Sequence, residues 1–194
     1  MSKETKDKLL DGTLSLIDKK PFHQISTKEI AEESGVAEVT LFRHFTNKES
    51  ILEILANKFF KMIVGFETRK IDSEEKFCTE LVKFFTRTTK SDPLSRRLFK
   101  VFLYIGMYRK KTFFKYASQY ERTIAGPIEQ IVDYGKKHWG YRIELDTDIT
   151  VKLLLNSIGF FNIIHNVFLL KESKPYDFEK IIEIGVDNFL RSLK

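Results

Sequence analysis

The sequence predicts an all-α fold in which a small three-helix N-terminal domain precedes a larger helical domain. Apolar residues recur at spacings of three and four along the 194 residues, which is the period of a helix. The chain has only nine glycines and four prolines, and it shows almost no strand-like alternation. In addition, the stretch from Ser26 to Lys48 has the spacing of two short helices joined by a tight turn.

The first helix is expected from Lys3 to Lys20. Its charged start is followed by an apolar stripe at near-helical spacing, formed by Leu9, Leu10, Leu14, Leu16 and Ile17. Pro21 should end this helix, because proline cannot donate a backbone hydrogen bond. Phe22 and Ile25 are then expected as apolar anchors beneath the turn into the next helix.

A capping box opens the second helix. The hydroxyl of Ser26 can accept from a first-turn amide, while Glu29 reaches back to the capping residue. Gly35 can take the left-handed conformation that ends a helix, and Val36 can fold back as an apolar plug. A third helix is then expected from about Glu38 to His44.

These two short helices have the pattern of a helix-turn-helix motif. Apolar residues fall where each helix would face the other: Ile30, Ala31, Val36, Leu41 and Phe45. The outer face of the later helix would then present Glu38, Val39, Thr40, Arg43 and His44. Threonine and valine can contact a thymine methyl group, and arginine can donate to guanine, so this face suits the major groove of DNA. A generic helical hairpin is the alternative.

The stretch from Leu9 to Phe60 resembles the N-terminal domain of TetR-type transcriptional regulators, through the segments LLDGTLSLI, ISTKEIAEESGV, TLFRHF and NKESIL. The resemblance implies an all-helical homodimer that binds double-stranded DNA at a palindromic operator and is released by a small molecule. It also implies DNA contacts at Ser26 or Thr27, and at Thr40, Phe42, Arg43, His44 and Lys48. Three positions depart from the common pattern: Ala37 replaces a frequent serine or threonine, Val39 a frequent glycine, and Phe42 the usual tyrosine.

The domain division follows from this pattern. We expect a DNA-binding domain over 1–47, a connecting helix over 48–70, whose apolar stripe runs from Ile51 to Phe66, and a ligand-binding and dimerisation domain over 71–194, giving about nine helices in all. In the last domain, either Asp72 or Ser73 is expected to start one helix, and the pair Asp92-Pro93 the next. The other expected features are a helix capped by Thr112 and an interruption at Gly126-Pro127. Asp146 or Thr147 should start a helix that reaches Leu170 and carries no charge from Leu153 onward, called the uncharged helix below, and Asp177 should start the last helix.

The C-terminal domain is rich in phenylalanine and tyrosine, and most of these rings must form its core. The family resemblance implies a cavity among them for a small apolar or aromatic effector. We expect its lining from Phe102, Met107, Phe113, Tyr120, Trp139, Phe160 and Phe161, with Asn156 or His165 as a polar anchor.

The uncharged helix should also form the dimer contact. One side, with Leu153 and Phe160, is expected to cover the core of its own domain. The opposite side and the last helix would meet a second copy through Leu155, Gly159, Asn162, Asn166, Ile181, Gly185 and Phe189.

Charge alone does not indicate DNA binding. The net charge is +6, yet Met1 to Gly65 holds ten basic and ten acidic residues. The dense basic region from Arg87 to Lys111 could face solvent, DNA or an anionic ligand. The single cysteine and the polar N-terminus indicate the cytoplasm, and the asparagines within the uncharged run argue against a membrane span.

No metal-ligand spacing, phosphate loop or catalytic motif is present, so we expect no cofactor, no metal and no enzyme activity. The leading hypothesis is therefore a DNA-binding transcriptional regulator, most simply a repressor. The alternative is a helical small-molecule-binding or protein-interaction module without DNA-binding function. The sequence does not identify the operator, the regulated genes, the effector or the sign of regulation.

Overall fold

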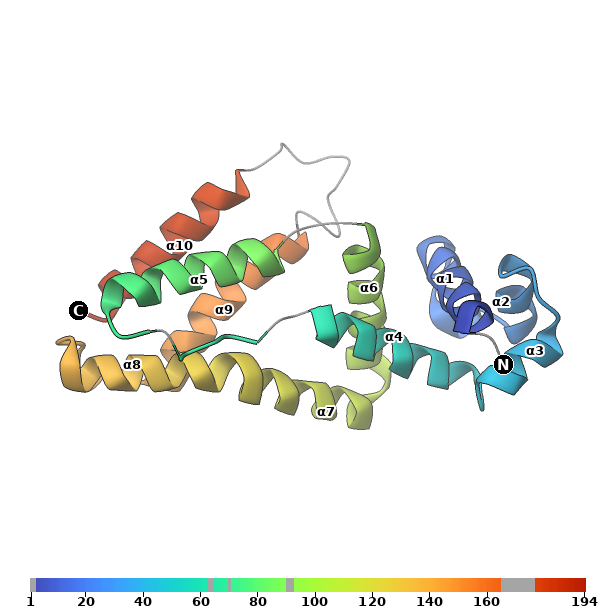
Figure 1. Cartoon of the computed structure of the whole chain (residues 1–194), viewed down its shortest axis with the longest axis horizontal. Helices are drawn as coiled ribbons and strands as arrows, with labels where there is room; N and C mark the ends of the chain where they lie inside the picture. The colour runs from blue at the N-terminus through green and yellow to red at the C-terminus, as the bar shows by residue number, and fades with distance from the viewer. Residues whose placement is uncertain (1–2, 63–64, 70, 90–92, 165–176) are drawn as a thin grey trace. The chain divides into compact units, whose positions relative to one another are not determined.

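The computed structural model describes residues 3–62, 65–69, 71–89, 93–164 and 177–194, and these residues form helices and connecting loops without a β-strand. The all-α prediction is thus confirmed. The chain divides into two compact units (Figure 1). Unit 1 comprises Met1–Met62 and Asp92–Tyr116, and unit 2 comprises Ile63–Ser91 and Ala117–Lys194.

Unit 1 contains the three predicted N-terminal helices, α1 (Lys3–Lys19), α2 (Thr27–Glu33) and α3 (Glu38–His44). It also contains α4 (Lys48–Met62), α6 (Pro93–Tyr108) and the first part of α7 (Lys110–Tyr120). Helix α1 packs on α2, α4 and α6, and α6 packs along α4. The sequence predicts α6 as part of the C-terminal domain, yet its contacts place it in the same compact unit as the N-terminal helices.

Aromatic rings hold α4, α6 and α7 together within unit 1. Phe60 stacks on Tyr116, with ring centroids 4.5 Å apart and planes 6° from parallel. Phe102 meets the rings of Phe59, Phe60, Phe99 and Phe113 at centroid distances of 5.4 to 6.1 Å. Such pairs add about 0.5–1.5 kcal/mol each beyond the burial of apolar area.

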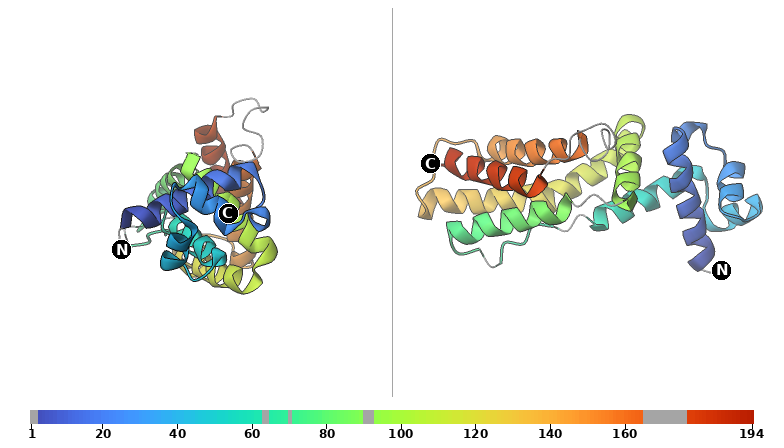
Figure 2. Two further views of the ribbon diagram at one scale, coloured as in Figure 1. Left: turned by 90° about the vertical axis from the view of Figure 1, so that its right-hand side faces the viewer. Right: turned by 90° about the horizontal axis from the view of Figure 1, so that it is seen from above.

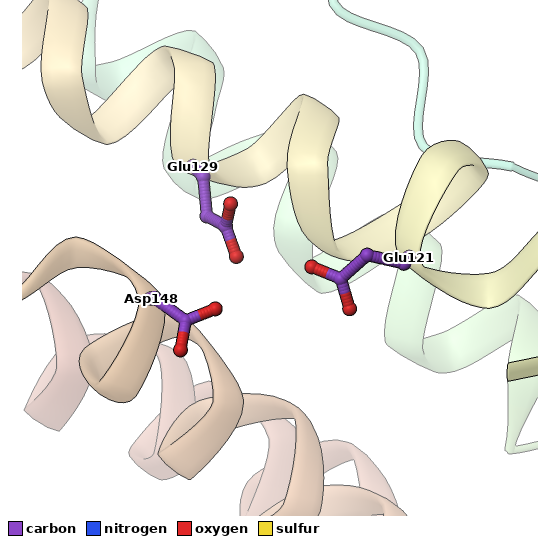
Figure 3. Close-up of side chains that lie close together, drawn as sticks. All are labelled: Glu121, Glu129 and Asp148. Carbon is purple, nitrogen blue, oxygen red and sulfur yellow. The ribbon is translucent and has the colours of Figure 1, made fainter. Parts of the chain in front are cut away.

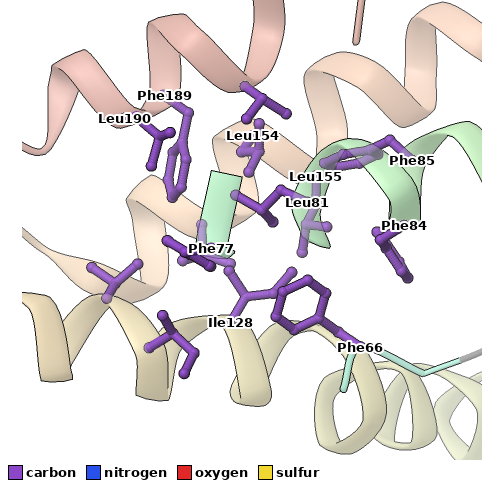
Figure 4. Packing of buried hydrophobic residues seen from close by; sticks show 14 of the residues in the cluster. Phe66, Phe77, Leu81, Phe84, Phe85, Ile128, Leu154, Leu155, Phe189 and Leu190 are labelled. Carbon is purple, nitrogen blue, oxygen red and sulfur yellow. The ribbon is translucent and has the colours of Figure 1, made fainter. Parts of the chain in front are cut away.

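Unit 2 is a bundle built from α5 (Glu74–Thr88), α8 (Gly126–His138), α9 (Thr147–Ile163) and α10 (Phe178–Ser192). Figure 2 shows these four helices running alongside one another, and α10 packs on both α5 and α9. Their facing sides fill one apolar core, in which Phe77, Leu81, Ile128 and Leu154 interdigitate (Figure 4). Burying each such side chain contributes about 1.5–3 kcal/mol, so this core is the main source of stability of the unit.

The predicted interruption at Gly126-Pro127 is present as a π-helical turn, η2 (Glu121–Ala125), between α7 and α8. Pro127 has no amide hydrogen, so it cannot donate to the carbonyl of Thr123 one helical turn earlier. That carbonyl instead accepts the amide of Phe66 at 2.9 Å, while Gly126 donates to Glu121. The turn therefore gives the segment after α4 a backbone anchor on this helix.

Most predicted helix starts are observed with the expected caps. Ser26, Ser73, Asp146 and Asp177 each accept a hydrogen bond from an amide of the first turn. The cap expected at Thr112 is wrong, because α7 begins at Lys110, one residue after α6 breaks at Arg109. The prediction that the apolar stripe of α4 continues to Phe66 is also wrong, because α4 ends at Met62. Phe66 lies outside any helix and belongs to the core of unit 2.

The two faces of α9 are reversed relative to the prediction. Leu153 and Phe160, expected to cover the core, are 66% and 63% exposed. Val151, Leu155 and Ile158 are buried in their place. The error arose because an apolar residue stands on every side of this helix, so its periodicity does not select one face. Of the uncharged run from Leu153 to Leu170, residues 165–170 lie outside the described residues. Among the described residues, no helix is both long and apolar enough to cross a bilayer.

Candidate nucleic-acid interface

The entry into α2 is fixed by the capping box that the sequence predicts. The backbone amide of Glu29 donates to Ser26 Oγ at 3.2 Å, and the amide and hydroxyl of Ser26 donate to Glu29 Oε2 at 2.8 and 2.9 Å. Lys20 donates to the other carboxylate oxygen at 2.5 Å. The hydrogen bonds from Lys20 and then from Ser26 lower the pKa of Glu29 to about 2. The carboxylate therefore stays ionised and holds the first turn at neutral pH.

The turn between α2 and α3 is also formed as predicted. Gly35 has φ 67°, the left-handed conformation that favours glycine, and donates to the carbonyl of Glu32. The amide of Val36 reaches back to the carbonyl of Ala31, which completes a Schellman motif. Ile30 and Leu41 are fully buried between the helices. Ala31 and Phe45 are buried as well, and Val36 is half-buried, so the expected inner face is confirmed except at Val36.

The outer face of α3 presents an apolar and cationic surface. Val39 and Phe42 are 58% and 52% exposed, and Arg43 is exposed beside them. Within the described part of the chain, no hydrogen bond or ion pair involves Arg43. Thr40 and His44 are half-buried, and the His44 ring lies 6.4 Å from that of Phe45. This surface has the composition that reads base edges and thymine methyl groups in a major groove.

Two of the predicted DNA-contact residues, Thr27 and Glu38, form a hydrogen bond with each other. Thr27 Oγ1 donates to Glu38 Oε1 at 2.5 Å, which ties the first residue of α2 to the first residue of α3. This bond fixes the relative position of the two helices. It also places the Glu38 carboxylate, a hydrogen-bond acceptor suited to a cytosine amino group, at the start of the outward face.

Lys48 has two acceptors within the protein. Its ammonium group donates to the carbonyl oxygens of Ile25 at 2.7 Å and Phe22 at 3.3 Å. The same nitrogen lies 4.8 Å above the Phe22 ring. The sequence could not predict this contact, because it joins the start of α4 to the turn before α2 across 23 residues of chain.

Comparison with known proteins identifies this motif. Residues 9–55 match the model of the family described as bacterial regulatory proteins, tetR family. Residues 9–55 are therefore similar to the TetR family. The chain is 41% identical over 54 residues to YvkB of Bacillus subtilis (strain 168), an uncharacterised HTH-type transcriptional regulator. That match covers 28% of this chain and spans 29% of the length of this relative.

The similarity of fold to solved regulator structures extends over nearly the whole chain. The TetR family transcriptional regulator PfmR from Thermus thermophilus matches with a TM-score of 0.70 at 17% identity, covering 96% of this chain and 98% of that one. MexZ, a repressor responsible for antibiotic resistance in Pseudomonas aeruginosa, matches with a TM-score of 0.70 at 13% identity, covering 97% and 96%. At these identities the likeness concerns the fold, and it covers both units.

Part of the basic region from Arg87 to Lys111 is paired within unit 1. Arg97 Nε and Lys100 Nζ donate to Asp18 at 2.5 and 2.8 Å, which clamps α6 to α1. Partial burial acts to raise the pKa of Asp18, but the hydrogen bonds from Lys100 and Arg97 lower it overall. Arg109, Lys110 and Lys111 remain exposed. Arg97 and Lys100 therefore have a partner within the protein, although both side chains remain partly exposed to solvent.

The predicted effector-lining residues do not gather at one place. Phe102 and Phe113 lie in the aromatic cluster of unit 1, while Met107 is 67% exposed. In unit 2, Trp139 packs against Phe77, Tyr134 and Tyr141, and Tyr120 lies against the core. Asn156 and Phe160 point outward from α9, so the sequence placed them on the wrong side of that helix. His165 lies outside the described residues.

A groove runs between α9 and α10, and it contains three of the predicted dimer residues. Ile181, Gly185 and Phe189 line it together with Leu153, Ser157, Phe161 and Ile184. Gly159 is open to its surroundings, with no neighbouring atom within 4 Å of the position that a Cβ would occupy, and Asn162 is half-buried. Leu155 is 5% exposed in the chain's own core, so its assignment to a dimer contact is wrong. Asn166 lies outside the described residues.

Three carboxylates cluster in unit 2, which the sequence did not indicate. One oxygen from each of Glu121, Glu129 and Asp148 lies within 4.8 Å of the others (Figure 3). Lys152 donates to Asp148 and lies 3.9 Å from Glu121, so one cation already offsets part of the charge. Burial, and then the neighbouring carboxylates Glu121 and Asp148, raise the pKa of Glu129. The residues come from three elements, and no local motif joins them.

Proposed function

We propose that this chain is a DNA-binding transcriptional repressor that binds a palindromic operator as a homodimer. The observation that carries the proposal is the outer face of α3, where Val39, Phe42 and Arg43 are exposed on a helix whose position is fixed from behind. An exposed Phe and Val beside an arginine that bonds to none of the described residues are suited to a partner with apolar and acceptor groups. The edges of base pairs in the major groove present both.

The repressor sign is supported by the fold shared with MexZ, which is described as a repressor. Release by a small apolar or aromatic effector is the mechanism implied by the family resemblance. It requires that the effector bind better to the conformation that does not fit the operator. The aromatic content of both units supplies surface for such a ligand.

The homodimer is proposed to form through α9 and α10. Ile149, Leu153 and Phe160 make an exposed apolar stripe along α9, and Ile184 continues it on α10 with 52% exposure. Pairing two copies across this stripe would build a four-helix contact related by a two-fold axis. The same symmetry places two recognition helices about 34 Å apart, which matches successive major grooves of a palindromic site.

The test is binding to DNA as a function of salt, followed by selection of bound genomic fragments. We expect the chain to be retained on mixed-sequence duplex DNA at low salt and released as salt rises, because phosphate contacts displace counterions. Arg43→Ala should relax base preference in the selection, while Lys61→Ala, on α4 away from this face, should leave it unchanged. A chain that is folded and dimeric but binds no DNA at low salt would favour the alternative, a helical ligand-binding or interaction module.

A further inference from the structure

One peptide group before α2 is held from both sides. Its carbonyl, from Ile25, accepts the ammonium of Lys48 at 2.7 Å. Its amide, from Ser26, donates to the carboxylate of Glu29 at 2.8 Å. Lys48 belongs to α4 and Glu29 to α2, so the orientation of this peptide is set jointly by two helices. Because Ser26 is the N-cap residue, the same peptide fixes the direction in which α2 begins.

The position of Lys48 needs partners of this kind. A lysine in the first turn of a helix meets the positive end of the helix dipole, which disfavours its charge. Hydrogen bonds from an ammonium to carbonyl oxygens are charge-assisted and stronger than neutral ones, and the Phe22 ring adds a cation–π contact. Two acceptors and one ring therefore offset the unfavourable placement, and they occupy most of the donor capacity that a phosphate would use.

The same turn touches α6. The Phe22 ring under the Lys48 ammonium meets Tyr104 edge to face, with centroids 5.5 Å apart and planes at 68°. Tyr104 in turn lies 4.8 Å from Tyr108, whose ring lies 6.2 Å from His23. Phe22 and His23, two consecutive residues before α2, thus contact the C-terminal half of α6. A shift of α6 would move the two carbonyl groups that Lys48 holds.

We propose that Lys48 is a positioning residue for operator recognition, which acts by orienting the Ile25–Ser26 peptide and hence α2, with no phosphate contact of its own. Tyr104 and Phe22 connect that peptide to α6, which makes this turn a point where the position of α6 alters the motif. The effect of Lys48 on operator affinity rests on the proposed function. Its effect on the Ile25–Ser26 peptide rests on the geometry alone.

The first experiment separates positioning from phosphate contact. Lys48→Met keeps a long apolar side chain over Phe22 but removes the positive charge and the hydrogen-bond donors. Lys48→Arg keeps the charge and the donors. We expect Lys48→Met to lose about tenfold in operator affinity, equivalent to about 1.4 kcal/mol, with an unchanged slope of log affinity against log salt. Lys48→Arg should recover most of the loss. A slope smaller by about 0.9 in Lys48→Met, with Lys61→Met as the matched control, would show a phosphate contact and overturn the proposal.

The second experiment asks whether Lys48 acts through the cap. Lys48 and Glu29 hold opposite ends of one peptide, so their effects on operator affinity should not be independent. We expect Lys48→Met to lose clearly less affinity in a Glu29→Gln background than in the native chain. Equal losses in both backgrounds would mean that Lys48 acts elsewhere, and they would overturn the assignment.

The third experiment does not depend on DNA. Amide hydrogen exchange should be faster at Ser26 in both Lys48→Met and Tyr104→Leu than in the native chain, because each change frees the peptide that Glu29 otherwise protects. Lys61→Met should leave that amide unchanged. If the chain binds no DNA, the proposed function fails, but the exchange rate at Ser26 still shows whether Lys48 orients the Ile25–Ser26 peptide. Unchanged exchange at Ser26 in Lys48→Met would overturn the inference even in a chain that binds DNA.

Discussion

Gly12 of α1 lies directly against Ser34 at the end of α2. A Cβ atom at position 12 would stand 2.3 Å from Ser34 Oγ, far inside van der Waals contact. The hydroxyl cannot simply turn away without loss, because it donates to the carbonyl of Ile30 at 2.6 Å. The close packing of α1 on α2 therefore requires glycine at position 12, because any Cβ atom there would clash with Ser34.

We expect Gly12→Ala to destabilise the chain by about 1–3 kcal/mol through overpacking, although alanine is the better helix former. The matched control is Gly159→Ala, in the C-terminal third of α9, where no neighbouring atom lies within 4 Å of the added carbon. There the substitution should stabilise by about 0.5–1 kcal/mol. Thermal unfolding at one protein concentration checks the opposite signs, and an increase in Tm for both variants would contradict the packing argument.

The dimer should depend on the outward stripe of α9. Leu153→Glu or Phe160→Glu is expected to yield a folded monomer with greatly weakened operator binding, because the charge would be buried in the contact between copies. Ile143→Glu, at an 81% exposed loop position, is the control. Sedimentation that shows an unchanged dimer for both α9 variants would exclude this stripe from the interface.

Gly185→Arg should behave differently from those variants. Gly185 faces Ile158 of the same chain, where a Cβ would lie 3.0 Å from Ile158 Cδ1. The arginine would separate α9 from α10, so we expect a loss of stability in the monomer itself. Circular dichroism during urea unfolding measures this loss. An unchanged unfolding midpoint, together with a monomeric state, would instead assign Gly185 to the contact between copies.

Glu29 should make folding depend on acid pH. Its folded pKa of about 2 lies below the ordinary value of 4.5, so the ionised carboxylate stabilises the native state above about pH 4.5 and this contribution is lost as pH falls toward 2. The stability difference between the native chain and Glu29→Gln should therefore be largest near neutral pH and shrink between about pH 5 and pH 3. A difference that stays constant over this range would show that the charge is not involved.

Glu129 should show the opposite sign. Its pKa is raised by burial and by Glu121 and Asp148, so the folded chain holds a proton that the unfolded chain releases, and stability falls as pH rises through that range. Glu129→Gln should raise Tm at neutral pH, and the gain should disappear near pH 4. Glu144→Gln, at an exposed loop position, should change little. A lower Tm for Glu129→Gln would contradict the prediction.

The N-terminal motif could be predicted from sequence because its determinants are local. The capping box of Ser26 and Glu29 and the left-handed Gly35 are each settled within four residues of chain, and all are observed. The outward direction of Val39 and Arg43 followed from helical spacing alone. The contacts of Lys48 and Asp18 join residues distant in sequence, so no pattern could supply them.

The faces of α9 could not be predicted for a different reason. Periodicity identifies a buried side only where polar residues mark the other side, and this helix exposes Leu153 and Phe160 while burying Leu154 and Leu155. An apolar surface that contacts a second copy of the chain has the same residue composition as a surface that faces the chain's own core. The sequence therefore indicated that two sides need cover, and it did not determine which one the chain covers itself.

The π-helical turn at Glu121–Ala125 contains one residue more than an α-helix needs over the same length. Each residue of an α-helix advances the side chains by about 100°, so a helical wheel drawn through Lys110 to His138 without this insertion misplaces every side chain after it by that angle. Removing one residue within the turn would restore an uninterrupted helix and rotate Ile128 and Val132 out of the core. In this segment, therefore, the alignment of related chains depends on whether each one carries the extra residue, and a single-residue gap there marks a change of helix phase.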